Sequence, residues 1–157
     1  MTDELRLSAT AALTDPEYVS YIDPITGADR SNERLAQVPE QTFTFAATWT
    51  KELEFGTLTL RGDYAYTGEY ALDAYNDTST ATGRAIVAAS TQPAGGVVNL
   101  RAAVRLPDEH WELAAFARNV TDNRDRVGAL VVNPLYVSEL LREPRTVGVQ
   151  ATYRFGQ

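Results

Sequence analysis

The sequence predicts an all-β protein, built as an antiparallel up-and-down meander of about six long strands. Three observations lead to this expectation. Apolar and polar residues alternate with period two in six separate segments. Each segment runs to roughly ten residues, which is longer than the ~5–6 of an average strand. The links between the segments are alternately long and short, as in a meander whose long connections all emerge at one end.

Taken in chain order, the six predicted strands cover residues 4–14, 41–51, 57–67, 97–106, 111–120 and 145–155. The alternation is clearest in the last segment, where the odd positions from Val147 to Phe155 are apolar or aromatic and the intervening ones are polar or small. The first four segments alternate in the same way. The fifth is less regular, because Phe116 falls out of phase with Trp111 and Leu113, and a β-bulge would account for this.

The links between these strands comprise residues 15–40, 52–56, 68–96, 107–110 and 121–144. A compact soluble domain rarely contains three structureless connections of this length, since loops beyond about 12–15 residues are uncommon. In an antiparallel meander, the three long links all fall at the same end of the sheet. Outer-membrane barrels have this asymmetry, with short periplasmic turns and long external loops.

The apolar faces favour an open, partial transmembrane β-barrel over a soluble β-sandwich. Strands of ~9–11 residues are long enough to span a bilayer. Aromatic rings gather at the two interfaces of membrane barrels, and here they lie near strand ends on the apolar faces. The residues that we expect to face lipid as an aromatic girdle are Phe43, Phe45, Trp49, Tyr64, Tyr66, Trp111, Tyr153 and Phe155.

The opposite faces carry charged side chains, which would be costly against lipid but are tolerated on a wet lumen. They can also pair across neighbouring strands. The candidates for a lumen-facing position are Arg61, Asp63, Arg101, Arg105 and Arg154.

Composition excludes several other classes of function. A net charge of -7 argues against a nucleic-acid partner, which would need clustered Lys and Arg. The chain has no Cys, and its one histidine, His110, lies in a predicted turn beside Asp108 and Glu109. No catalytic set or metal site can be assembled around it. The carboxylates of the long links are expected to be solvated. We therefore expect a protein that is not an enzyme, with no catalytic residues, no metal and no cofactor.

Four motifs together resemble TonB-dependent receptors. "VPEQTFTFAATW" (38–49) and "LTLRGDYAYTGEY" (58–70) look like consecutive strands of that family. "WELAAFARNVTDN" (111–123) is similar to the penultimate strand, and "PRTVGVQATYRFG" (144–156) is similar to the last one. The chain departs from the family at its end, because Gly156 and Gln157 follow Phe155, whereas members usually end on the aromatic residue.

The resemblance implies that residues 1–157 are the C-terminal portion of a receptor barrel in the outer membrane of a Gram-negative bacterium. Such a receptor imports a siderophore, a metal complex, cobalamin or a glycan. The implied partners are outer-membrane lipid, the remainder of the barrel with its plug domain, and TonB, which binds the N-terminal part. The barrel-assembly machinery would read Tyr153 and Phe155. The plug is absent from these residues, so we expect the segment to be inactive alone.

Two alternatives remain open at this point. A small complete barrel needs at least ~8 strands, and extra strands would then lie in 15–40 or 68–96, with Arg84–Thr91 as the best candidate. A soluble β-sandwich binding module is favoured by the N-terminus, which lacks the features of a signal peptide.

Overall fold

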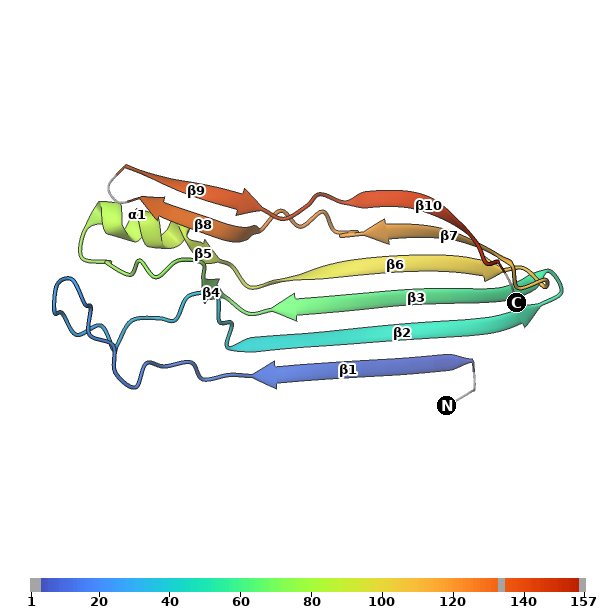
Figure 1. Ribbon diagram of the computed structural model, residues 1–157, viewed down its shortest axis with the longest axis horizontal. Helices are drawn as coiled ribbons and strands as arrows, with labels where there is room; N and C mark the ends of the chain where they lie inside the picture. The colour runs from blue at the N-terminus through green and yellow to red at the C-terminus, as the bar shows by residue number, and fades with distance from the viewer. Residues whose placement is uncertain (1–3, 133–134, 156–157) are drawn as a thin grey trace.

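Six long strands form one antiparallel sheet in the computed structural model, which describes residues 4–132 and 135–155 (Figure 1). Their order across the sheet is the order along the chain, and the first and last strands each have one neighbour, so the sheet is open. This confirms the predicted all-β meander. The strands are β1 (Leu5–Leu13), β2 (Gln41–Leu53), β3 (Gly56–Thr67), β6 (Gly95–Arg105), β7 (Trp111–Arg118) and β10 (Thr146–Tyr153).

Two tight turns join the strands at one end of the sheet (Figure 1). Between β2 and β3 the chain reverses through Gly56, whose φ of 133° is a conformation that side chains rarely adopt. Between β6 and β7, the N–H of Leu106 donates to the carbonyl of Trp111 at 2.9 Å and closes the second turn. The long links emerge at the opposite end, as the alternation of link lengths predicted.

The cross-strand register keeps each set of alternating residues on one face of all six strands. One row of direct partners runs through Leu5, Trp49, Leu60, Ala102, Ala115 and Val149. The adjacent row, on the other face, runs through Arg6, Thr48, Arg61, Arg101, Phe116 and Gly148. Because neighbours in a ladder point to the same side, the sheet has one apolar and one polar face throughout.

The suggested bulge in the fifth strand is wrong. Residues Trp111 to Arg118 pair continuously with β10, so Phe116 lies in phase on the polar face. Its ring covers Gly148, where an added Cβ would come within 2.6 Å of the ring carbon Cζ. An aromatic ring over a cross-strand glycine shields the exposed backbone there, which explains an apolar residue among polar ones.

Two of the three long links contain regular secondary structure, whereas link 15–40 has turns and isolated bridges. Link 68–96 contains β4 (Tyr70–Ala71), the helix α1 (Ala81–Ala89) and β5 (Thr91–Gln92). Link 121–144 contains the hairpin of β8 (Arg126–Val132) and β9 (Tyr136–Leu141). An extra barrel strand at Arg84–Thr91 is therefore wrong. The Thr80 side chain accepts from the N–H of Gly83 at 2.9 Å and starts a helix through most of this segment.

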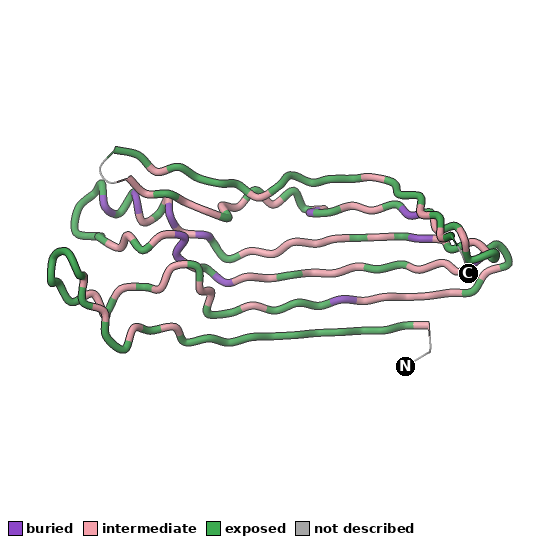
Figure 2. Tube along the Cα trace, viewed as in Figure 1, coloured by how far each residue is buried: buried purple, intermediate pink, exposed green. Residues whose placement is uncertain are grey.

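Most of the deeply buried residues lie at this end and not in the sheet (Figure 2). Leu72, Ser90 and Gln92 are each at most 3% exposed, and Ile86 of α1, whose carbonyl accepts from the N–H of Ser90, is 9% exposed. A parallel bridge between Ala36 and Ala71 joins this unit to link 15–40. We call the folded parts of the three long links the end layer. The sheet itself has no comparable core, because its two faces remain open.

Neither alternative architecture is found. Within residues 4–132 and 135–155, the two further sheets have two strands each, and neither packs as a second layer over the six-stranded sheet. A β-sandwich needs such a layer. A complete small barrel needs closure, and β1 and β10 have no mutual pairing in the described part. No helix of that part has the length and apolar character needed to cross a membrane.

Candidate functional site

The apolar face is one of two broad surfaces that the sheet presents, and its side chains are unusually exposed. Val149 is 86% exposed and Val147 is 72% exposed on the edge strand β10, although both pair regularly with β7. Leu7, Phe45, Leu100 and Leu113 are also exposed on this face. A soluble monomer seldom leaves a contiguous apolar surface of this extent uncovered, so the face is built to contact another apolar phase or partner.

Aromatic rings cluster toward both ends of the apolar face. At the long-link end, the rings of Phe43 and Tyr66 stack with centroids 4.9 Å apart, and Tyr64 lies 5.6 Å from Phe43. At the short-turn end, the ring of Tyr153 lies 4.9 Å from that of Trp111 and 4.7 Å from that of Phe155. The two clusters thus contain six of the eight residues of the predicted girdle, and Phe45 and Trp49 lie on the same face outside these ring contacts.

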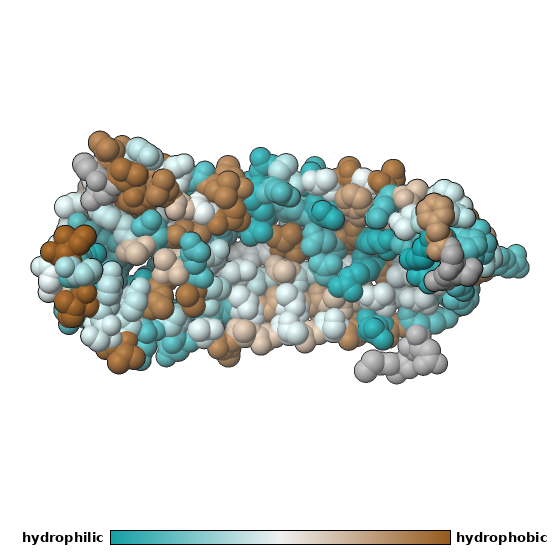
Figure 3. Space-filling model, in the orientation of Figure 1, coloured by the Kyte–Doolittle hydropathy of each residue, from teal (hydrophilic) through white to brown (hydrophobic). Residues whose placement is uncertain are grey.

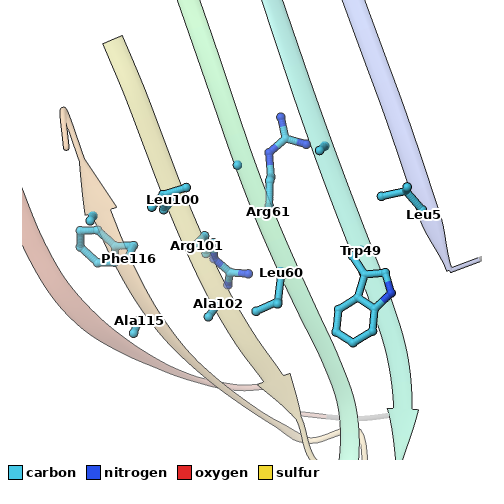
Figure 4. Close-up of a pocket in the computed structure, with 12 residues that line it drawn as sticks. Leu5, Trp49, Leu60, Arg61, Leu100, Arg101, Ala102, Ala115 and Phe116 are labelled. Carbon is cyan, nitrogen blue, oxygen red and sulfur yellow. The ribbon is translucent and has the colours of Figure 1, made fainter. Parts of the chain in front are cut away.

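Between these clusters, small side chains leave a shallow hollow of about 580 Å³ in the apolar face (Figure 4). Trp49 of β2 and Leu60 of β3 stand side by side at one end of it, and Leu100 of β6 lies across from them. Alanine and glycine form the floor, at Ala47, Gly62, Ala102, Ala115 and Ala117. The apolar face is therefore smooth and low in its middle and bulky toward its ends.

The polar face carries all five residues that were expected to face a lumen. Two ion-pair groups organise them. Arg61 lies 3.7 Å from Asp63, whose second oxygen accepts a 2.8 Å hydrogen bond from the side-chain amide of Asn99. The second group is centred on Glu112, which pairs with Arg101 at 2.7 Å, Arg154 at 3.4 Å and Arg105 at 3.6 Å.

Sequence reasoning missed Glu112 and Asn99. Both are in phase with the polar faces of their strands, so alternation placed them correctly. Their partners, however, depend on the register between strands, which a single sequence does not give. On the side of the molecule that Figure 3 presents, hydrophilic and intermediate side chains prevail over the sheet, and hydrophobic ones gather at the end layer.

Nothing in the described part of the chain resembles a metal centre: no group of three or more His, Asp or Glu could hold an ion there. His110 lies in the short turn before β7, and its ring packs 5.7 Å from Tyr153.

The link carboxylates instead shape turns. Asp23 accepts hydrogen bonds from the N–H groups of Ile25 and Thr26, and these bonds, with the nearby Arg30, lower its pKa. Asp29 and Asp77 each accept from a serine two residues later, which lowers the pKa of both.

Comparison with known proteins identifies this arrangement. The family profile "TonB dependent receptor-like, beta-barrel" matches residues 2–120, which is more than half of the chain. The crystal structure of the ferric yersiniabactin uptake receptor FyuA from Yersinia pestis superposes on 99% of the chain with a TM-score of 0.78, at 14% identity. That of BauA, the ferric preacinetobactin receptor from Acinetobacter baumannii, superposes on 97% with a TM-score of 0.64, at 18% identity.

The chain spans only 22% of the FyuA chain and 20% of the BauA chain. No curated protein sequence matches it. At these identities the two structures support the fold, and the family profile supports the family. With its open meander and its segregated faces, the chain belongs to the TonB-dependent receptor-like β-barrel family.

Proposed function

We propose that residues 1–157 form the C-terminal wall segment of an outer-membrane TonB-dependent receptor of a Gram-negative bacterium. The observation that carries this proposal is the unbroken apolar face, which runs in register across all six strands opposite a polar face rich in arginine. Such a sheet can satisfy lipid on one side and water on the other.

The open edges of β1 and β10 support a segment of a larger barrel. A strand edge leaves backbone donors and acceptors unpaired, and each unsatisfied group costs several kcal/mol in lipid. Barrels of this class close about 22 strands, and this chain contributes six long ones. The segment alone would therefore be inactive, and its edges pair with the remainder of the barrel.

The proposed orientation follows from the two ends of the sheet. The tight turns lie on the periplasmic side, and the end layer of α1 and the β8–β9 hairpin lies outside the cell. The apolar face and its girdle then contact lipid, and Arg61, Asp63, Arg101, Arg105 and Arg154 line the inside. The plug domain and TonB are partners of the whole receptor, and Tyr153 and Phe155 carry the signal for the barrel-assembly machinery.

The proposed cargo is a ferric siderophore, because FyuA is a ferric yersiniabactin uptake receptor and BauA is a ferric preacinetobactin receptor. Another metal complex, cobalamin or a glycan would fit the same barrel class. In each case the role is transport and not catalysis.

The test is deletion of the gene that encodes the chain, followed by growth on candidate iron sources and fractionation of the tagged wild-type protein. We expect the protein in the outer-membrane fraction, and loss of growth on one iron source that returns when the whole gene is restored. Residues 1–157 expressed alone should require detergent and should not restore uptake. A detergent-free monomer with a cooperative melt would contradict the proposal.

A further inference from the structure

A hollow in the polar face lies beside a cluster in which arginines outnumber carboxylates. It has a volume of about 290 Å³, lies near the short-turn end, and is lined by Thr50, Thr57, Thr59, Arg101, Ala103, Arg105 and Glu112. Arg154 reaches the same carboxylate from the end of β10. Three guanidinium groups therefore surround one carboxylate, and the cluster keeps an excess of two positive charges.

The contacts within the cluster are unequal. Arg101 takes the Oε1 atom of Glu112 in a close 2.7 Å contact. Arg105 and Arg154 both approach the other oxygen, Oε2, at the looser distances of 3.6 and 3.4 Å. A guanidinium has five N–H donors in a fork that matches the two oxygens of a carboxylate. Arg105 and Arg154 therefore share a single carboxylate oxygen, although two guanidinium groups that were each paired with a whole carboxylate would contact four oxygens.

Another carboxylate on this face, that of Glu52, contacts a hydroxyl and not an arginine. Glu52 lies across Thr57 from Arg105 in the register, and both of its oxygens accept from the Thr57 hydroxyl, at 3.0 and 2.9 Å. No ion pair joins Glu52 to the three arginines within the described residues. In the described part of the chain, Glu112 is therefore the one acid that pairs with the three arginines.

The imbalance extends over the whole polar face. Its six arginines, on β1, β3, β6, β7 and after β10, outnumber its three acids, Glu52, Asp63 and Glu112. The chain as a whole is acidic, with a net charge of -7. Negative charge is therefore concentrated elsewhere, and the positive field on this face raises the local concentration of anions.

We infer that this hollow binds a carboxylate from outside residues 1–157, held between Arg105 and Arg154. The guanidinium forks supply charged donors to its two oxygens, and the threonine hydroxyls of β2 and β3 line the space around it. The inference rests on the proposed function, because only in a closed barrel does this polar face line an interior that other segments or small molecules can occupy. The carboxylate comes either from an Asp or Glu of another polypeptide segment or from a small molecule.

A zero-length cross-link tests the inference in the complete receptor. Lys51 is the only lysine of the chain, so Arg105→Lys and Arg154→Lys each add one amine that carbodiimide can join to a carboxylate in contact. We expect mass spectrometry to find the new lysine joined to an acid outside residues 1–157. The native Lys51–Glu4 pair, 2.8 Å apart, is the positive control, and Arg101→Lys should instead join Glu112.

A second measurement distinguishes the source. If the carboxylate belongs to a small molecule, citrate added at constant ionic strength should raise the melting temperature, and Arg105→Gln should weaken citrate binding about tenfold. Arg124→Gln, in a long link, is the matched control. Cross-links confined to Glu112 or Glu52, together with no effect of citrate, would overturn the inference. Failure of the proposed function appears separately, as absence of the protein from the outer-membrane fraction.

Discussion

Arg61 of β3 and Arg101 of β6 are direct cross-strand partners on the polar face, yet their guanidinium groups pair with different carboxylates. Arg61 pairs with Asp63 at 3.7 Å, and Arg101 pairs with Glu112 at 2.7 Å. Like charges directly opposite each other destabilise a sheet. Each arginine is therefore paired with its own acid. Asp63 pairs with one arginine, whereas Glu112 pairs with three.

We first predict that Glu112→Gln destabilises the receptor more than Asp63→Asn. Glu112 is 16% exposed and holds three arginines, so its loss leaves Arg101, Arg105 and Arg154 facing one another. We expect a decrease of about 2 kcal/mol in the free energy of unfolding, against less than about 1 kcal/mol for the more exposed Asp63 pair. Urea unfolding measures both, with Glu109→Gln in the exposed turn as control. Equal effects would show that Glu112 does not organise the cluster.

The second prediction concerns Gly56 in the β2–β3 turn. Its φ is 133°, and a Cβ added there would collide with the backbone carbonyl oxygen of Arg105 on β6. Backbone cannot move aside as a flexible side chain does, so Gly56→Ala should cost at least about 2 kcal/mol and shift the β3–β6 register. Gly27→Ala is the matched control, because its φ is 70° and no atom lies within 4 Å of the added Cβ. That change should cost about 1 kcal/mol. A mild Gly56→Ala would contradict the turn geometry.

The third prediction separates the end layer from the wall. Leu72 is 3% exposed, and its N–H donates to the carbonyl of Ser90, the C-cap residue of α1. Leu72→Ala removes buried apolar volume and should cost the end layer about 2–3 kcal/mol. Limited proteolysis should then cut within residues 68–96, while the heat-resistant mobility of the barrel on gels stays unchanged. Val19→Ala, at a 98% exposed position, is the control. Loss of the barrel band would mean that wall and end layer unfold together.

The fourth prediction is a pH dependence in link 15–40. Hydrogen bonds from Ile25 and Thr26, and the charge of Arg30, lower the pKa of Asp23 in the folded turn. The stabilisation is therefore present above the pKa of the unfolded chain, about 3.9, and is lost as the pH falls through the lower folded value. Hydrogen exchange of the Gly27 amide, which donates to the Asp23 carbonyl, should rise between pH 6 and 3 after correction for the intrinsic rate. Asp23→Asn should remove the pH dependence; an unchanged profile would contradict the assignment.

The sequence predicted the six-stranded sheet better than the end layer, for a physical reason. In a strand with one apolar face, the period of two sets which side each residue occupies, so the faces of Val147 to Tyr153 follow directly from the chain. Arg84–Thr91 contains β-branched and small residues that suit either a strand or a helix. Its helix depends on the Thr80 cap outside the segment and on tertiary contacts with β9.

The sequence predicted which face of the sheet each residue of the candidate site occupies, but not which residues contact one another there. Arg101 and Arg105 lie on β6 and Arg154 directly follows β10, and the three meet because the register places Glu112 of β7 beside them. A one-residue slip would bring other residues together. Phe116 shows the same limit. The suggested bulge was wrong because the reason for an aromatic residue on the polar face, covering Gly148, depends on β10, a strand that is not adjacent in sequence.

The last prediction tests which side of the sheet faces lipid. Val149 and Gln150 are neighbours in β10, and alternation puts them on opposite faces, paired with Ala115 and Ala114 of β7. If the apolar face contacts the bilayer, Val149→Arg places a charge in lipid and should cost ~2–4 kcal/mol near the midplane, whereas Gln150→Arg adds a charge to a wet wall and should be mild. The fraction of receptor that reaches the outer membrane in a heat-modifiable form should fall for the first variant alone. Equal losses, or a greater loss for Gln150→Arg, would reverse the assignment of the two faces.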